Sequence, residues 1–160
     1  MVAKFKAVEE GSKAPLFDLP TDGKGRVRLA DLRGKTVVLY FYPKDDTAGC
    51  TREAIDFSAA EKSFKRAGAV IIGVSKDSAA KHERFKDKHA LSIKLGSDEA
   101  GEVVAAYGSW VEKTLYGRKY MGIDRSTFLI DGKGVVRKVW RKVKVPGHVD
   151  EVLAAVKALG

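Results

Sequence analysis

The stretch TVVLYFYPKDDTAGCTREAIDFSAAEKSFKRAGAVIIGVS, residues 36–75, predicts a strand, a helix and a second strand. Its first seven residues are a continuous run of β-forming side chains, which is typical of a strand buried on both faces, and Pro43 ends that run. The helical pattern that follows stops at Gly68. The last seven residues are again apolar. Because a helix connects the two runs, we predict that they lie parallel to each other.

The second half of the chain predicts two helices and a hairpin. One helix has Ser97 as its N-cap and ends at Gly108. STFLI (residues 126–130) and GVVRKVW (residues 134–140) flank the turn-rich DGKG, which predicts an antiparallel hairpin. Residues 147–159 carry apolar side chains at helical spacing and predict the last helix.

The order of these elements predicts the fold class. Strand, helix, strand, then hairpin and helix is the order of a thioredoxin-like core. SAAKHERFKDKHA, residues 78–90, adds a helix that we expect to be solvated. We therefore predict an α/β fold with a mixed sheet flanked by helices, an N-terminal extension and a central insertion. We expect residues 1–160 to form one domain, since no repeat or linker marks a second.

Composition places the chain among soluble globular proteins, with 44% hydrophobic and 32% charged residues. No apolar stretch approaches the ~18 residues of a membrane span. The segment MVAKFKAVEEGSKAPLF lacks the apolar core of a signal peptide. The single cysteine, Cys50, cannot form an intramolecular disulfide. We therefore expect a cytoplasmic protein with no membrane partner.

The formal net charge of +9 is concentrated in one stretch. KGVVRKVWRKVK, residues 133–144, holds six cations and no acid. Lys142 and Lys144 alternate with valines, which predicts a strand with one solvated basic face. A nucleic-acid surface is the alternative interpretation. No nucleic-acid motif accompanies the stretch, so nucleic acid is not the partner we expect.

Cys50 lies at the start of the first predicted helix. The first backbone N–H groups of a helix have no partner within it and carry positive partial charge, which stabilises a thiolate. Gly49 has no side chain to block whatever the sulfur attacks. Thr47 stands where a Cys-x-x-Cys pair would have its first sulfur, and its hydroxyl can hydrogen-bond a thiolate or a bound oxygen. These residues favour reaction with a small oxidised molecule, and an inert buried cysteine is the alternative.

The segment PKDDTAGC, residues 43–50, has the pattern Pro-x-x-x-Thr-x-x-Cys, which resembles the active-site motif of peroxiredoxins. The resemblance covers nearly the whole chain and is closest to the bacterioferritin-comigratory, or peroxiredoxin Q, subfamily. GSKAPLFDLPTDG, GVSKDS and WVEKTLYGRKYMGIDRSTFLIDGKG resemble other segments of that subfamily. The resemblance implies an antioxidant thiol peroxidase with a thioredoxin fold and no cofactor.

The resemblance also implies roles for five residues. Cys50 is the nucleophile that becomes a sulfenic acid, Thr47 donates its hydroxyl toward the peroxide, and Pro43 shields the sulfur from water. Arg125, in DRSTFLI, matches the arginine that the family brings from a distant strand, where a fixed cation stabilises thiolate and developing oxyanion. Glu53 matches the subfamily's Thr-x-x-Glu pattern and has a supporting role. The alternatives are a surface ion pair between the arginine and the preceding aspartate, and a first-turn helix acid for Glu53.

The chain departs from the subfamily in its cysteines. Many members carry a resolving cysteine five residues after the peroxidatic one, where this chain has Ile55, and others carry it further along. Cys50 stands alone, so the resemblance implies a one-cysteine peroxiredoxin. An outside thiol then reduces the sulfenic acid: thioredoxin, glutaredoxin, glutathione or a second subunit's Cys50. We expect a monomer, as in many members, with a dimer as the alternative.

Other classes of function explain fewer residues. His82, His89 and His148 have no carboxylate or thiol cluster that completes a metal site, so we expect no metal. A thioredoxin-fold binding or chaperone module with an unreactive cysteine is one alternative, and a nucleic-acid-binding protein is another. Neither explains why the proline, threonine, cysteine and arginine of the motif occur together.

Overall fold

The structure is a computed structural model and describes residues 8–159. The domain prediction and the prediction for the N-terminal segment therefore extend beyond the described residues. None of the helices in the described part of the chain is long and apolar enough to cross a bilayer.

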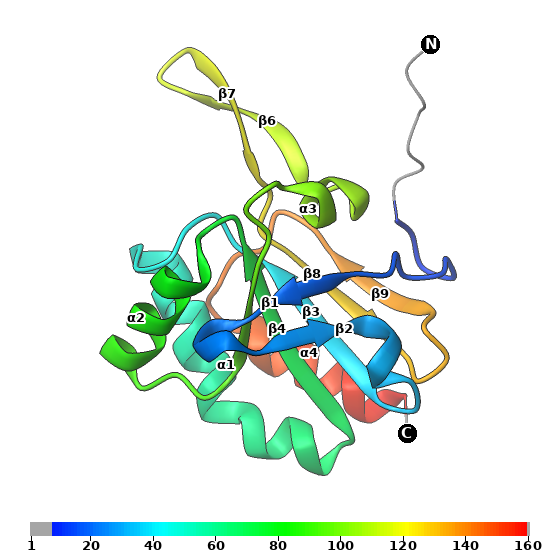
Figure 1. The fold of residues 1–160 in the computed structure, drawn as a ribbon. Coiled ribbons are helices and arrows are strands. Elements are labelled where there is room, and N and C mark those ends of the chain that lie inside the picture. Colours follow the sequence, from blue (N-terminus) through cyan, green and yellow to red (C-terminus); the bar gives the residue numbers. More distant parts are fainter. Residues whose placement is uncertain (1–7, 160) are drawn as a thin grey trace.

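A mixed five-stranded sheet forms the centre of the protein (Figure 1). Its strands lie in the order β5 (Lys94–Ser97), β4 (Ala69–Ser75), β3 (Thr36–Phe41), β8 (Ser126–Ile130) and β9 (Val136–Trp140). β3 pairs in parallel with β4, and β4 in parallel with β5. β8 pairs antiparallel with both β3 and β9. The predicted parallel pair, the predicted hairpin and the mixed thioredoxin-like sheet are therefore confirmed.

One face of this sheet is covered by three helices, namely α1 (Ala48–Arg66), α2 (Ala79–His89) and α4 (His148–Ala158). Successive side chains of β3 point to opposite faces, and Val38 and Tyr40 point toward these helices. Phe57 of α1 and Val152 of α4 are fully buried against them. This layer carries the cysteine.

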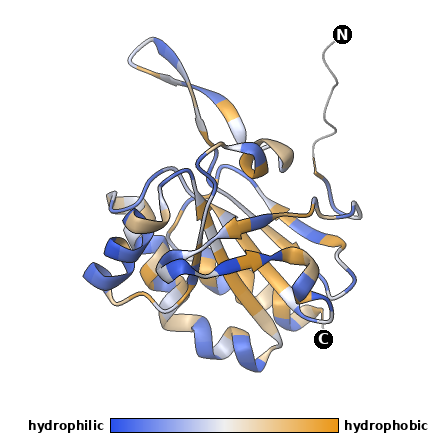
Figure 2. Cartoon of the chain, in the orientation of Figure 1, coloured by the Kyte–Doolittle hydropathy of each residue, from blue (hydrophilic) through white to orange (hydrophobic). Residues whose placement is uncertain are grey.

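The other face is covered by the N-terminal extension and by α3 (Glu102–Ala106). The extension contains β1 (Asp18–Pro20) paired with β2 (Arg26–Arg28), and two 3₁₀ turns, η1 (Asp22–Lys24) and η2 (Leu29–Leu32). Leu39 and Phe41 of β3 pack into this second core. Burial on both faces explains why β3 is a continuous apolar run, and Figure 2 shows the central strands as predominantly hydrophobic.

A two-stranded hairpin that the strand pattern did not predict projects from the domain (Figure 1). It pairs β6 (Trp110–Leu115) with β7 (Arg118–Ile123). Tyr116 and Gly117 form its turn, with φ values of 50° and 76°. Positive φ at both central residues is typical of a two-residue hairpin turn. Gly117 was therefore the signal that sequence analysis missed, because glycine readily adopts the positive φ that such a turn needs.

The predicted N-cap at Ser97 is wrong. Ser97 ends β5 instead of capping a helix, and its hydroxyl donates to the backbone oxygen of Asp77 at 2.6 Å. α3 has Gly101 as its N-cap, and the Asp98 carboxylate accepts from the backbone N–H of Val104 at 2.9 Å. The helix starts later because the residues before it complete a turn.

The basic stretch at 133–144 is not one strand. β9 ends at Trp140, and Lys142 has a φ of 49°, in the left-handed region. The Arg141 guanidinium donates to three backbone oxygens at 3.2–3.3 Å. Arg137 forms an ion pair with Asp131 at 3.3 Å. The chain thus leaves the strand after Trp140, and these contacts engage two of the six cations.

Candidate active site

Cys50 is the third residue of α1 and faces the protein interior. The loop from β3 runs directly into this helix. Cys50 and Ala54, one turn apart, are each 1% exposed, and Phe57 is fully buried on the same stripe. The backbone N–H of Thr51 makes the first bond of the helix, to the Thr47 oxygen at 2.8 Å. The three preceding amides, including that of Cys50, are therefore those that a helix leaves without intrahelical partners.

Sheet topology brings Arg125 to this cysteine from 75 residues away. Phe41, at the end of β3, pairs with Ser126, at the start of β8. Arg125 precedes Ser126 and so lies beside the C-terminal end of β3, where the loop toward α1 begins. Its Nη2 donates to Cys50 Sγ at 3.3 Å. A fixed cation therefore lies against the sulfur.

Gly49 permits this approach. A Cβ atom built on Gly49 would lie 3.1 Å from Arg125 Nη2, which is closer than ordinary van der Waals contact. The sequence predicted that this glycine lets a molecule approach the sulfur. In the structure, the group that it admits is the guanidinium.

Glu53 lies on the same helix face and holds the other side of the guanidinium. Its Oε1 accepts from Arg125 Nη1 at 2.7 Å, and the side chain is fully buried. Its Oε2 has no partner among the described residues. The Asp124 carboxylate accepts instead from the backbone N–H of Lys142 at 3.4 Å. The alternative of a surface pair between Arg125 and Asp124 therefore does not describe the structure.

Burial and charge oppose each other at this pair. Burial raises the pKa of Glu53 to about 7, although the positive charge of Arg125 opposes the shift. For Arg125, burial lowers the pKa, but the charges of Glu53 and Cys50 outweigh it and raise the pKa above its ordinary value. The site thus combines a permanent cation with an acid that titrates near neutral pH. When Glu53 is protonated, the arginine's charge acts chiefly on the sulfur.

Thr47 and Pro43 lie in the exposed loop before α1. Thr47 is the N-cap residue of α1, and its hydroxyl donates to the backbone oxygen of Lys44 at 2.9 Å. The structure therefore brings Arg125 into direct contact with both Cys50 and Glu53. It places the other two motif residues along the chain that leads to the sulfur.

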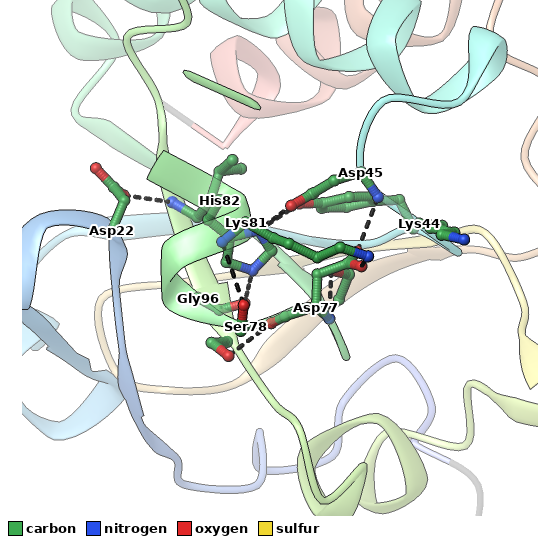
Figure 3. Close-up of polar contacts among 12 residues, drawn as sticks. Asp22, Lys44, Asp45, Asp77, Ser78, Lys81, His82 and Gly96 are labelled. Carbon is green, nitrogen blue, oxygen red and sulfur yellow. Dashed lines mark hydrogen bonds and ion pairs between the residues drawn. The ribbon is translucent and has the colours of Figure 1, made fainter. Parts of the chain in front are cut away.

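A second group of buried polar residues was missed by sequence reasoning (Figure 3). His82 of α2 was predicted to lie on a solvated helix, yet it is fully buried and contacts Asp45 of the loop. Phe85 is buried on the same face, three residues later. That spacing is the signal, because residues three apart share one helix face and an apolar neighbour marks it as inward.

The described residues contain no group of three or more histidine, cysteine, aspartate or glutamate side chains arranged to hold a metal ion. His148 donates to, or accepts from, the Thr127 hydroxyl at 2.8 Å. Burial lowers its pKa. His89 contacts Asp46 at 2.8 Å near the surface.

The profile of the AhpC/TSA family matches residues 11–139, which is most of the chain. The chain is a peroxiredoxin of that family. It is 51% identical over 150 residues to peroxiredoxin Bcp of Bacillus subtilis, a match that covers 94% of this chain and 96% of that protein. The predicted bacterioferritin-comigratory, or peroxiredoxin Q, subfamily is confirmed, and this peroxiredoxin is a thiol peroxidase.

Solved structures resemble this peroxiredoxin along most of its length. The bacterioferritin comigratory protein of Xanthomonas campestris, described by its alkyl peroxide reduction activity, superposes with a TM-score of 0.86 at 44% identity. That match covers 89% of this chain and 91% of the other. A peroxiredoxin Q mutant from Xylella fastidiosa superposes with a TM-score of 0.91 at 35% identity, covering 96% and 98% of the two chains. The predicted fold class is confirmed.

Proposed function

We propose that Cys50 is the peroxidatic nucleophile of this thiol peroxidase, and that it reduces hydrogen peroxide and alkyl hydroperoxides. The contact between Arg125 Nη2 and Cys50 Sγ, at 3.3 Å in the first turn of α1, carries this proposal. A cation and unpartnered helix amides both favour the thiolate, which is the reactive form. The alkyl peroxide activity of the Xanthomonas campestris relative supports the wider substrate class.

The reaction forms one bond and breaks one. The Cys50 thiolate attacks one peroxide oxygen, the S–O bond forms, and the O–O bond breaks. The departing oxygen leaves as hydroxide or alkoxide and takes up a proton to become water or an alcohol. The sulfur is oxidised to sulfenic acid while the peroxide is reduced. Negative charge thus moves from the sulfur to the departing oxygen, and donors fixed near both atoms lower the barrier.

Four neighbouring residues have separate roles in this reaction. Arg125 stabilises the thiolate and the developing oxyanion, and Glu53 holds the guanidinium in position through its 2.7 Å contact. Thr47 supplies a hydroxyl at the start of α1, which rotates from the Lys44 oxygen toward the peroxide. Pro43 shapes the loop and limits water at the sulfur.

An outside thiol completes the cycle, because the 160-residue sequence holds one cysteine. The first thiol displaces water from the sulfenic acid and forms a mixed disulfide. A second thiol releases the Cys50 thiolate and leaves as a disulfide. Thioredoxin, glutaredoxin and glutathione are the proposed reductants, and Cys50 of a second subunit is the alternative. We propose a single-domain monomer that works in the reducing cytoplasm.

Intact-mass spectrometry tests this proposal. Reduced protein receives one equivalent of hydrogen peroxide or tert-butyl hydroperoxide, alone, with a sulfenic-acid trap, and with glutathione or thioredoxin. The expected result is a trapped sulfenic acid on Cys50 that one of the thiols reduces, and no adduct in Cys50→Ser. A dominant Cys50-linked dimer would indicate resolution between subunits. If Cys50 stays reduced while free cysteine in the same tube oxidises, the proposal is wrong.

A further inference from the structure

A buried contact joins the loop before Cys50 to helix α2 (Figure 3). Asp45 of the loop is 8% exposed, and His82 of α2 is fully buried. Asp45 Oδ2 lies 2.6 Å from His82 Nδ1. The other carboxylate oxygen of Asp45 accepts from the Tyr42 hydroxyl at 2.5 Å. None of these three side chains has a part in the peroxide reaction as described above.

The partners of His82 determine where its protons lie. Nε2 is 3.0 Å from the backbone oxygen of Gly96. A carbonyl oxygen only accepts, so Nε2 carries a hydrogen. Nδ1 faces a carboxylate oxygen, so a second proton lies between the ring and Asp45. Contacts on both sides fix the orientation of the ring. The loop is thereby tied to α2 and, through the ring, to β5.

The loop backbone is held at the same residue. The Asp45 N–H donates to Asp77 Oδ2 at 2.8 Å. The next residue, Asp46, has a φ of 61°, in the left-handed region that few non-glycine residues adopt. Its carboxylate contacts Lys88 at 2.7 Å and His89 at 2.8 Å, but the carboxylate itself is exposed, so solvent weakens both pairs. The buried Asp45–His82 contact is therefore the stronger tie.

The two reactants of Cys50 differ in how much access to the sulfur they need. Its side chain is 1% exposed with the loop in this position. A peroxide is small, whereas a thiol reductant has to bring its own sulfur into line with that of Cys50. The loop runs directly into the first turn of α1, so opening the loop moves the cysteine. The contacts that close the loop therefore favour the first reactant and oppose the second.

We propose that His82 is a positioning residue that acts through Asp45. It holds the loop 43–47 closed over the site, which sets the geometry for peroxide and limits the access of outside thiols. This inference rests on the proposed role of Cys50 as the nucleophile. It assigns to α2 a part in the balance between oxidation and reduction of that residue.

His82→Gln tests the proposal, and Lys86→Gln is the matched control. Lys86 belongs to the same helix and pairs with Asp22 at 2.9 Å, away from the loop. Cys50 is alkylated under native conditions by iodoacetamide and by a maleimide that carries a polyethylene glycol chain. Because both reagents need the thiolate, the ratio of bulky to small alkylation rates reports access. We expect this ratio to rise about tenfold in His82→Gln, as for a local opening favoured by the loss of one buried contact, and to stay within about twofold in Lys86→Gln.

Kinetics of the two half-reactions separate positioning from simple destabilisation. In His82→Gln, oxidation of Cys50 by peroxide slows about tenfold, whereas reduction of the preformed sulfenic acid by glutathione becomes faster. Asp45→Asn breaks the same contact from the loop side and should reproduce both changes if His82→Gln does not fold. An unchanged alkylation ratio in a folded variant, or both half-reactions slowing together, overturns the proposal. Alkylation does not require peroxidase activity, so failure of the proposed function would be seen separately.

Discussion

Two buried contacts between acid and base lie at the two ends of the segment from Asp45 to Glu53, and they differ in how completely their atoms are paired. Both oxygens of the Asp45 carboxylate and both ring nitrogens of His82 have partners. At the other end, Glu53 contacts Arg125 with one oxygen, and its second oxygen has no partner in the described part of the chain. A buried polar atom without a partner lowers stability.

The difference in pairing indicates that the two contacts have different functions. Full pairing holds a loop in one position, because every alternative position loses several bonds at once. Incomplete pairing leaves the protonation of Glu53 sensitive to pH, since burial has already raised its pKa to about 7. The Glu53–Arg125 contact, which adjusts charge, is therefore next to Cys50. The Asp45–His82 contact, which holds the backbone, involves a residue five positions before Cys50. Three sets of variants test this division.

The largest effect is expected from removing the cation beside the sulfur. Arg125→Met alone would leave the Glu53 carboxyl buried without its partner, which would itself lower stability. We therefore compare Arg125→Met combined with Glu53→Gln against Glu53→Gln alone. Loss of the arginine should lower kcat/KM for hydrogen peroxide by about 10²–10³, the usual effect of removing one donor from a developing oxyanion. Stopped-flow kinetics under limiting peroxide measure it.

Arg137→Met is the control for this experiment. It removes the same charge from an exposed ion pair on β9 and should leave the peroxide reaction unchanged. A loss smaller than tenfold in the double variant, relative to Glu53→Gln, would contradict the role given to Arg125.

Glu53→Gln should change how stability depends on pH. The folded protein keeps the Glu53 proton up to about pH 7, whereas an ordinary glutamate releases it near 4.5. Between these values the folded state binds more protons than the unfolded state, so the free energy of unfolding falls as pH rises. The full decrease is about 3 kcal/mol, and above pH 7 it is constant. Glutamine has no proton to release, so the variant gains this amount relative to wild type across the same window.

Urea unfolding from pH 4.5 to pH 8 measures this difference. Glu112→Gln, on the exposed hairpin, is the control and should follow the wild-type curve. If the curves of wild type and Glu53→Gln run parallel, the carboxyl does not titrate in this window.

Much of the fold could be predicted because local patterns coincide with burial. β3 is apolar on both faces, so its continuous run of β-formers predicts a central strand, and the helix after it places Cys50 on the inward stripe. The contact with Arg125 could not be derived from spacing, since it depends on the pairing of β3 with β8 across the sheet. Resemblance to a family supplied that residue.

The errors arose where tertiary contacts override local pattern. Lys142 and Lys144 alternate with valines as strand residues do, but β9 ends at Trp140, and the side chain of Arg141 bonds backbone oxygens of segments distant in the sequence. His82 lies among charged residues, and its burial depends on Asp45, which is 37 residues away. A buried polar residue is recognised only when its partner is known, and sequence pattern does not identify the partner.

The smallest effects are expected from two neighbouring tyrosines, of which one bonds Asp45 and the other does not. The Tyr42 hydroxyl donates a hydrogen bond to Asp45, whereas the Tyr40 hydroxyl is buried without a partner in the described residues. Tyr42→Phe leaves an oxygen of Asp45 short of a donor and should lower the free energy of unfolding by about 1–3 kcal/mol. Tyr40→Phe removes an unpaired hydroxyl and should be neutral or stabilise by up to about 1 kcal/mol.

Each variant serves as the other's control, because both remove one oxygen from a buried ring in the same core cluster. Urea unfolding gives the two free energies. The rate of Cys50 alkylation should rise in Tyr42→Phe, which loosens the loop, and stay constant in Tyr40→Phe, which does not touch it. Equal losses of stability in the two variants would mean that burial of the ring, and not the bond to Asp45, sets the cost. The loop would then be held by packing, and the contrast between a holding contact and a charge-adjusting contact would not stand.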